Sequence, residues 1–272
     1  YLKGEFGVGQ FGRLVARSII QSGIPSSTLN NAETESRQEE DFETPEIESL
    51  YRVTVGAVNA DQYPLWMATL PSNLKRHSKF VGVWAWEVDD FPKRFFPAFD
   101  LVDEIWAISE FVRASIQPHT KKPVLVVPAP IIAPEITENL DRAAIGLSGD
   151  RPFNLFMFDY FSIFKRKNPL DLIAVHKTAF PEENGPILVI KTVNAGKHAT
   201  QHEQLLFSVS DRTDILVVDK YLSREQLHCL VNECQTYISL HRSEGYGLTI
   251  AEAMSLGKPV IATGYSGNLD FM

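Results

Sequence analysis

The sequence predicts an α/β protein made of two doubly wound domains, each built on a parallel sheet. β-prone runs alternate with helix-prone segments over residues 53–127, and the same alternation starts again at residue 153. A proline-containing polar stretch, residues 128–150, separates the two series and is typical of an interdomain linker. A chain of 272 residues is long enough for two such cores. We therefore expect an N-terminal domain over residues 1–148 and a C-terminal domain over residues 149–272.

The first half opens with a helix-prone segment and continues as alternating strands and helices. Apolar residues recur with helical spacing over residues 11–20, and Gly23 follows as a stop. Pro92 stands at the first turn of one later helix, and Ser109 is a suitable N-cap for the next. The expected strands are residues 53–58, 80–86, 104–108 and 124–127, and the expected helices are residues 65–70, 92–101 and 110–117.

The second half repeats this alternation. Asn168 and Pro169 are expected to cap one helix, and Ser223 forms a capping box with Gln226 at the start of another. Gly257 is placed to end the last helix as a C′ glycine. The expected strands are residues 153–158, 186–190, 214–218, 237–240 and 259–262, and the remaining helices are residues 168–180 and 248–256.

The formal net charge of −8 is concentrated in one stretch of the chain. Residues 33–48 carry eight acidic residues and one arginine, which gives this stretch a charge of −7. With the surrounding Ser, Thr and Asn residues it predicts a solvated, mobile acidic loop over about residues 28–48. The charge balance of the remaining chain gives no indication of a nucleic-acid partner.

Composition and cysteine usage are those of a cytoplasmic globular protein. Apolar residues make up 44% of the chain, and no apolar run approaches the roughly 20 residues of a membrane helix. Cys229 and Cys234 are five positions apart on different faces of one predicted helix, so a disulfide between them is implausible. No signal peptide and no metal-ligand spacing are visible. We expect a cytoplasmic location, with peripheral contact at the inner face of the membrane as an open alternative.

A Gly-x-Gly-x-x-Gly string, Gly7 to Gly12, has two interpretations at this point. The first is a dinucleotide-binding loop, which requires a full strand before it and an acidic residue about 20 positions later. Only three residues of a strand, Tyr1 to Lys3, precede the string, and residues 25–30 lack that acid. The second is a glycine turn that allows close helix packing, which the sequence favours.

A stretch near the end of the chain, residues 237–263, predicts strand, glycine loop, helix and strand in succession. Gly245 and Gly247 place a loop before the helix. A loop that opens a helix presents free backbone N–H groups and the positive helix end, which together suit a phosphate. Glu244 and Glu252 lie on either side of this turn and could hold different parts of one ligand. The alternative is that Glu244 is an ordinary loop acid and Glu252 faces solvent. Glycoside hydrolysis is disfavoured, because it requires two acids on opposite faces of a sugar.

Ligands of doubly wound folds bind beyond the carboxyl ends of the strands, so residues directly after strands are candidates for binding. Lys165, Arg166 and Lys167 would suit a diphosphate, or would form a solvated basic loop. Trp86 and Glu87 could hold a sugar together with Trp84, although tryptophans in a central strand are usually buried. The candidates at strand ends are Asn59, Asp61, Glu87, Ser109, Asn194, His241, Arg242, Glu244 and Gly264.

Residues 244–263 resemble the signature of retaining glycosyltransferases of group 4, which have the GT-B fold. That signature is Glu-x7-Glu followed by Ala-Met-x-x-Gly-x-Pro-Val-Ile-Ala, and here it reads from Glu244 through Glu252 to Ala262. A looser resemblance covers residues 84–87 and 99–106. The tail, residues 264–272, resembles the subgroup that acts on bacterial surface polysaccharides.

The resemblance implies two Rossmann-like domains that face each other across a cleft, with the donor held by the C-terminal domain and the acceptor by the N-terminal one. It implies a hexosyltransferase-type enzyme that moves a sugar from a nucleotide-sugar to a glycan, lipid-linked or other acceptor with retention of configuration. No metal or other cofactor would be required. Members of the family extend further in both directions, so we expect a chain truncated at both ends with an incomplete C-terminal domain.

Site residues follow from the resemblance position by position. Glu244 would be the catalytic residue that contacts the donor sugar, and Glu252 would hold the ribose hydroxyls. Arg166 and Lys167 match the basic pair of the family only approximately, because Phe158-Asp159 replaces its usual Gly-Arg. On the acceptor side the resemblance implies Trp86 and Glu87. The diphosphate would be bound by the N–H groups of Tyr246, Gly247 and Leu248, and by Gly7 and Gly9, which resemble the N-terminal glycine loop of the family.

Two other functions remain open from the sequence. The string from Gly7 to Gly12 could serve an NAD(P)-dependent oxidoreductase. The chain could also be a non-catalytic module that binds a sugar nucleotide or a partner.

Overall fold

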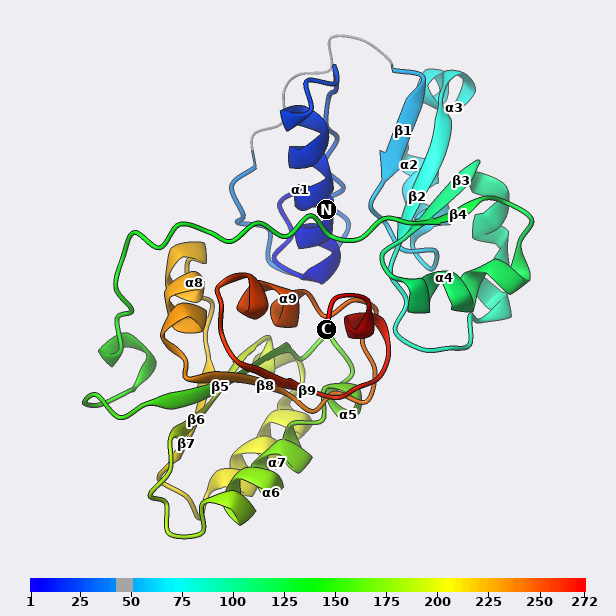
Figure 1. The fold of residues 1–272 in the computed structure, drawn as a ribbon. Coiled ribbons are helices and arrows are strands. Elements are labelled where there is room, and N and C mark those ends of the chain that lie inside the picture. Colours follow the sequence, from blue (N-terminus) through cyan, green and yellow to red (C-terminus); the bar gives the residue numbers. More distant parts are fainter. Residues whose placement is uncertain (43–50) are drawn as a thin grey trace. The chain divides into compact units, whose positions relative to one another are not determined.

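The computed structural model describes residues 1–42 and 51–272 and confirms an α/β architecture with two parallel sheets (Figure 1). Contacts within the chain divide it into two compact units. The first contains Tyr1–Pro130, Glu244–Leu248 and Ser266–Met272, and the second contains Ile131–Ser243 and Thr249–Tyr265. The chain thus passes from the first unit to the second inside the predicted linker. The sequence-based domain limits, 1–148 and 149–272, stay a prediction.

The first sheet has four parallel strands in the order β1-β2-β3-β4. Because the order follows the chain, each strand end lies beside the end of the next one. The elements of this unit are α1 (Gly7–Gln21), β1 (Val53–Gly56), α2 (Tyr63–Thr69), α3 (Ser72–His77), β2 (Lys79–Trp84), the 3-10 helix η1 (Lys93–Leu101), β3 (Glu104–Ala107), α4 (Glu110–Ile116), the 3-10 turn η2 (Gln117–His119), β4 (Val124–Val126) and the 3-10 turn η5 (Gly267–Asp270).

An aromatic cluster forms the core on one side of this sheet. Trp84 is fully buried, and its ring centroid lies 5.7 Å from that of Phe99 and 6.3 Å from that of Phe91. Trp84 is therefore a packing residue, and the idea that it contributes to a sugar site is wrong. The helix expected over residues 92–101 is a 3-10 helix that begins at Lys93, with Pro92 at its N-cap. Pro97 lies inside it, and in an α-helix the ring of Pro97 would clash with the carbonyl four positions earlier.

The second sheet has five parallel strands in the order β7-β6-β5-β8-β9. The chain starts in the centre at β5, builds outward through β6 and β7, and then returns to the other side of β5. This reversal is the topological switch point of a doubly wound sheet. The elements of this unit are η3 (Ala143–Ile145), β5 (Phe153–Asp159), α5 (Phe164–Lys167), α6 (Pro169–Ala179), β6 (Ile187–Val193), η4 (Ala195–Lys197), α7 (Ala199–Val209), β7 (Ile215–Asp219), α8 (Arg224–Glu233), β8 (Thr236–Ser239), α9 (Leu248–Ser255) and β9 (Val260–Ala262).

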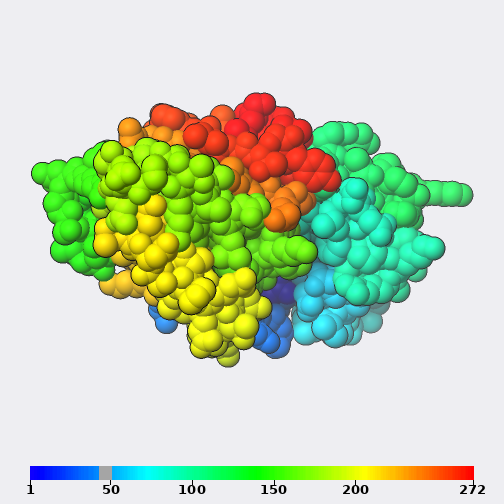
Figure 2. All heavy atoms as spheres, turned by 90° about the horizontal axis from the view of Figure 1, so that it is seen from below, coloured from blue at the N-terminus to red at the C-terminus, as the bar shows by residue number. Residues whose placement is uncertain are grey.

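Helices cover both faces of the second sheet, with α6 and α7 on one face and α8 and α9 on the other (Figure 1). The central strand β5 is buried over its first six residues, as expected for a parallel strand covered on both sides. Leu172 of α6 and Leu205 of α7 pack into one core with Phe156 and Leu188. The outer surface of α7 is visible in Figure 2. Phe207 of this helix is 82% exposed.

The described part of the predicted acidic loop is held in place by residues 3–5. The guanidinium group of Arg37 donates to both carboxylate oxygens of Glu5, at 2.5 and 2.6 Å. Backbone bonds join Glu5 to Arg37 and Glu40 to Lys3. Residues 24–42 form no helix or strand, as predicted, but residues 37–40 are bonded rather than freely solvated. Glu43, Glu46 and Glu48 lie outside the described residues.

Candidate functional site

The motif stretch folds as the sequence predicts, as strand β8, a loop, helix α9 and strand β9. Gly247 has φ +93°, which a side-chain-bearing residue rarely adopts, and it leads directly into α9 at Leu248. Gly257 has φ +70° and its N–H donates to the carbonyl of Met254, so it is the predicted C′ glycine.

Both backbone polar groups of Glu244 are fixed by the tail of the chain. Its N–H donates to the Oγ of Ser266 at 2.7 Å, and its carbonyl accepts from the N–H of Gly267 at 2.9 Å. Glu244 is only 8% exposed, so it is not an ordinary solvated loop acid. A Cβ on Gly267 would lie 2.1 Å from the carbonyl oxygen of Gly245, so glycine is required there. Sequence reasoning missed the part played by this tail.

Further bonds attach the same loop to the first sheet. The Oγ of Ser109, which is fully buried, donates to the carbonyl of Gly245 at 2.5 Å. It also accepts from the N–H of Val112 at 3.2 Å, which makes Ser109 the predicted N-cap of α4. A Cβ on Gly245 would lie 2.9 Å from the carbonyl oxygen of Trp86. The loop is thus held at the carboxyl ends of β2 and β3.

Tyr246 anchors the middle of the loop through its side chain. Its ring packs against Phe11 and Phe271, with centroids at 6.5 and 5.0 Å, and its hydroxyl donates to the carbonyl of Ala129 at 3.4 Å. Burial raises the pKa of the Tyr246 phenol above its usual value. Tyr246 can therefore offer its backbone N–H to a ligand while its side chain stays in the core.

The predicted acceptor-side residues lie just beyond β2, between this strand and η1. Trp86 is half-buried, its Nε1 donates to the carbonyl of Asp90 at 2.9 Å, and its ring contacts Phe91 and Phe95. Glu87 is half-buried next to it. The strand ends at Trp84, two residues earlier than predicted, so Trp86 and Glu87 belong to the loop at the carboxyl edge.

The basic run of the second unit forms the short helix α5 beside the end of β8. Arg166 Nη1 donates to the carbonyl of Ser243 at 2.8 Å, and the N–H of Arg242 donates to the carbonyl of Arg166 at 2.8 Å. The structure therefore brings Arg166 next to the residue that precedes Glu244. Lys167 is half-buried in the same helix, whereas Lys165 is exposed.

Asn168 and the residues at the end of β8 have structural roles. Asn168 is the N-cap residue of α6 and Pro169 begins the helix, as predicted. The side chain of Asn168 makes no capping bond, and its Nδ2 donates to the carbonyl of Leu240 at 2.8 Å instead. His241 is 1% exposed and bonds to the Oγ of Ser239, as expected of a packed strand-end residue. Arg242 pairs with Asp171 at 3.1 Å.

A polar network at the ends of β5 and β6 was only partly expected. Asn194 was a candidate from its position after a strand; its Nδ2 donates to Asp159 at 2.7 Å, and its Oδ1 accepts from the hydroxyl of Tyr221 at 2.9 Å. Burial raises the pKa of the Asp159 carboxyl, and the bonds from Asn194 and from the N–H of Phe161 oppose that shift. Asp159 stands where the resemblance implies an Arg of a Gly-Arg pair, so no cation occupies this position.

The string from Gly7 to Gly12 forms the first turns of helix α1 rather than a loop. A Cβ on Gly9 would lie 2.3 Å from the carbonyl oxygen of Gly4, and one on Gly12 would lie 3.1 Å from the Cβ of Ala57. The close-packing interpretation is therefore confirmed for these two positions. Residues 1–6, which lead directly into the string, form no strand.

The described residues contain neither a candidate metal site nor a candidate membrane span. No group of three or more His, Cys, Asp or Glu side chains in residues 1–42 and 51–272 could hold a metal ion. Within the same ranges, no helix is long and apolar enough to cross a membrane.

Both cysteines are buried and form no disulfide, and burial raises the pKa of Cys234 to about 11.

One known protein family matches the second half of the chain. Residues 162–272 match the family of glycosyl transferases group 1, and this segment contains both motif glutamates. No curated protein matches the sequence.

Solved structures share the fold at low sequence identity. Anabaena HepE in complex with UDP and glucose superposes with a TM-score of 0.60 at 14% identity, over 82% of this chain and 62% of that one. The pneumococcal O-GlcNAc transferase GtfA in complex with UDP and GlcNAc gives a TM-score of 0.55 at 15% identity, over 80% and 44% of the two chains. Staphylococcus aureus TarM superposes with a TM-score of 0.53 at 13% identity, over 79% of this chain and 42% of that one. The chain thus spans less than two thirds of the length of each.

Proposed function

We propose that the protein is a retaining, hexosyltransferase-type glycosyltransferase, because residues 162–272 match the family of glycosyl transferases group 1. It transfers a sugar from a nucleotide-sugar donor to a glycan, lipid-linked or other acceptor. The pathway that the tail of the sequence favours is synthesis of a bacterial surface polysaccharide.

The observation that carries this proposal is the pair of glutamates in the matched segment, spaced as Glu-x7-Glu across a glycine loop and the start of α9. Glu244, whose backbone is bonded at both polar groups, is proposed to contact the donor sugar and act as the catalytic residue. Glu252 lies on α9, one turn from its end, and is proposed to bind the ribose hydroxyls.

The donor diphosphate requires positive charge and free N–H groups. The N–H groups of Tyr246, Gly247 and Leu248 stand where α9 begins, and the helix dipole favours an anion there. Arg166 and Lys167 of α5 are proposed to add two cations. The N–H groups of Gly7 and Gly9 belong to the first turn of α1, whose N–H groups have no partner within the helix, and are proposed as further donors.

The reaction breaks the bond between the anomeric carbon and the donor phosphate and forms a bond from that carbon to the acceptor oxygen. Negative charge develops on the departing nucleoside diphosphate, so N–H groups and cations placed beforehand lower the barrier. The proton of the acceptor hydroxyl goes to the departing phosphate, and no protein base is assigned. Trp86 and Glu87 are proposed to position the acceptor.

Turnover of a donor panel tests the proposal. The chain is incubated with UDP-, GDP- and ADP-sugars, and release of nucleoside diphosphate is followed with and without glycan acceptors. Glu244→Gln should lower the rate by at least about 100-fold, as is typical when a group acting in the transition state is removed. The matched control is Glu203→Ala, which removes an exposed carboxylate from α7. Equal rates for the parent chain and Glu244→Gln would refute the assigned role, and the anomeric configuration of the product tests retention.

A further inference from the structure

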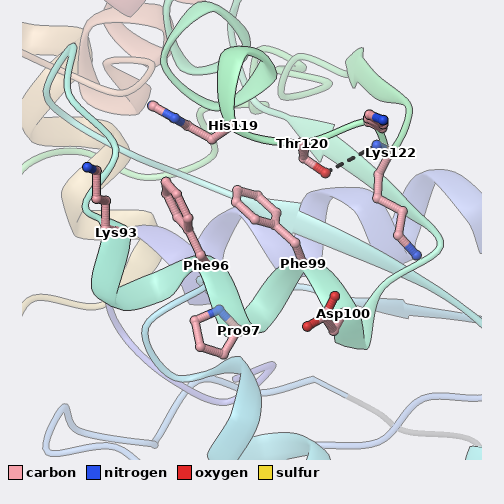
Figure 3. Close-up of a pocket in the computed structure, with 9 residues that line it drawn as sticks. Lys93, Phe96, Pro97, Phe99, Asp100, His119, Thr120 and Lys122 are labelled. Atoms are coloured by element: carbon pink, nitrogen blue, oxygen red, sulfur yellow. Dashed lines mark hydrogen bonds between the residues drawn. The ribbon is translucent and has the colours of Figure 1, made fainter.

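An open hollow of about 750 Å³ lies in the first unit between η1 and the turn that joins η2 to β4 (Figure 3). Its residues come just before β3 and β4, since Asp100 precedes Glu104 and Lys122 precedes Val124. The hollow is therefore at the amino edge of the sheet. The loop of residues 244–247 is bonded to Ser109 at the carboxyl edge of the same sheet. The hollow and this loop therefore lie at opposite edges.

Positive charge dominates the hollow. Among the described residues, Lys93, Lys121 and Lys122 line it together with one carboxylate, Asp100. The ammonium groups of these lysines make no ion pair or hydrogen bond with any other residue that the structure describes. Lys93 lies at one end of the hollow and Lys122 at the other (Figure 3). Two separated cations without partners match a ligand that carries more than one negative charge.

Aromatic rings form the floor between these cations. Phe96 is half-buried, and its ring centroid lies 5.5 Å from that of Phe99 and 5.0 Å from that of His119 (Figure 3). Phe99 is buried and packs against Trp84, so this part of the floor belongs to the aromatic core. The electron-rich face of a ring attracts the polarised C–H bonds on one face of a sugar.

The wall opposite η1 is also ordered. The N–H of Lys122 donates to the Oγ1 of Thr120 at 3.1 Å, and the side-chain amide of Gln117 donates to the carbonyl of Thr120 at 3.2 Å. These bonds fix the turn that presents Lys121 and Lys122. The hollow is therefore preformed, which lowers the entropy cost of binding.

We propose that this hollow binds an acidic glycan, a chain whose successive sugars carry carboxylate or phosphate groups, through its lysines and the Phe96 ring. This inference rests on the proposed function and specifies its acceptor class: an extended acidic polysaccharide held at a distance from the reacting edge. A lipid surface fits less well, because none of the lining residues is among the exposed large apolar side chains of the described chain.

Calorimetric titration with an oligogalacturonate of ten sugars tests the site, with a malto-oligosaccharide of the same length as the neutral probe. Lys93→Gln/Lys122→Gln should weaken oligogalacturonate binding about tenfold, since each exposed ion pair contributes up to about 1 kcal/mol. Phe96→Leu, which keeps an apolar side chain but removes the aromatic face, should also weaken it. The matched control, Arg76→Gln/Lys79→Gln, removes two exposed cations elsewhere in the same unit and should leave binding unchanged.

Three results would overturn the inference. The first is that the malto-oligosaccharide binds as tightly as the oligogalacturonate, and the second is that both double variants weaken oligogalacturonate binding equally. The third is that the protein binds only phosphatidylglycerol vesicles and that this binding depends on Lys93 and Lys122. Binding of UDP, GDP and ADP is measured on the same samples. If none of the three nucleotides binds while oligogalacturonate binding is intact, the result counts against the proposed function alone. If one of them binds and oligogalacturonate does not, the result counts against the hollow alone.

Discussion

The hydroxyl of Ser109 donates a hydrogen bond to the carbonyl of Gly245, 136 positions later in the chain, with the two atoms 2.5 Å apart. The same oxygen accepts from the N–H of Val112 and so caps α4. One buried side chain therefore stabilises both a helix start and the loop that contains Glu244. Asp270 extends the connection, because its carboxylate accepts from the N–H of Glu110 at 2.6 Å.

Removing this hydroxyl should loosen the motif loop. Ser109→Ala loses a cap and a buried hydrogen bond, and we expect the free energy of unfolding to fall by about 1–3 kcal/mol. Amide hydrogen exchange over residues 244–248 should become faster. Ser109→Thr keeps the hydroxyl and should restore both properties.

The matched control is Ser115→Ala, because Ser115 is also buried in α4 and its Oγ donates to the carbonyl of Val112. We expect Ser115→Ala to lower the free energy of unfolding without a specific increase in amide hydrogen exchange over residues 244–248. If Ser115→Ala accelerates exchange in that loop as much as Ser109→Ala, the bond to Gly245 has no special role.

A side chain added at Gly267, in the tail, should also destabilise the fold. A Cβ at this position would lie 2.1 Å from the carbonyl oxygen of Gly245, so the loop has to move to accept Gly267→Ala. We expect a loss of about 1–3 kcal/mol in unfolding free energy, as for other overpacked sites. Gly264→Ala is the control, because no atom lies within 4 Å of its added Cβ, and it should change stability by less than about 0.5 kcal/mol. Equal melting temperatures for the two variants would contradict the close approach.

A buried charged group in the second unit predicts loss of stability in acid. Asp214 is fully buried and accepts from Arg212 at 2.7 Å and from His176 Nε2 at 3.0 Å. Burial opposes ionisation of Asp214, but the bonds from Arg212 and His176 keep its pKa below the usual value. Burial lowers the pKa of His176, and the bond to Asp214 only partly offsets this.

The pKa values of Asp214 and His176 are both lower in the folded state than in the unfolded state. Both groups therefore stabilise the fold at pH values above their unfolded pKa. His176 contributes fully above about pH 6.5, and its contribution is lost as pH falls through its lower folded pKa. The contribution of Asp214 to stability is lost below about pH 4. The melting temperature should therefore fall between pH 7 and pH 5, and the slope should be smaller in His176→Gln. Identical slopes in the two proteins would show that His176 is not the group that titrates.

Local sequence signals predicted the strands and caps but not the contacts between distant segments. The buried run of β5 and the N-cap at Ser109 follow from composition and position, and both are confirmed. Helix α7 was missed because only Leu205 and Val209 of its eleven residues are buried, which leaves little apolar periodicity. Helix α3 buries only Leu74 and was missed for the same reason.

The candidate site was predictable where the motif is continuous in sequence. The turn at Gly247 and the stop at Gly257 were expected from glycine placement and are confirmed by their positive φ angles. The anchoring of Glu244 by Ser266 depends on a residue 22 positions away. No local pattern of spacing or hydropathy encodes such a pair. The roles of Glu244 and Glu252 toward a donor stay a prediction.

The most direct test of the central claim is calorimetric titration of the chain with UDP, GDP, ADP and NAD, for the parent protein, Glu252→Ala and the control Glu203→Ala. We expect one nucleoside diphosphate to bind the parent and Glu203→Ala equally. Binding to Glu252→Ala should be at least about tenfold weaker, because the bonds of a carboxylate to two hydroxyls are lost. NAD should not bind with comparable affinity. If no nucleoside diphosphate binds, or if Glu252→Ala binds as tightly as the parent, the proposed donor site is wrong.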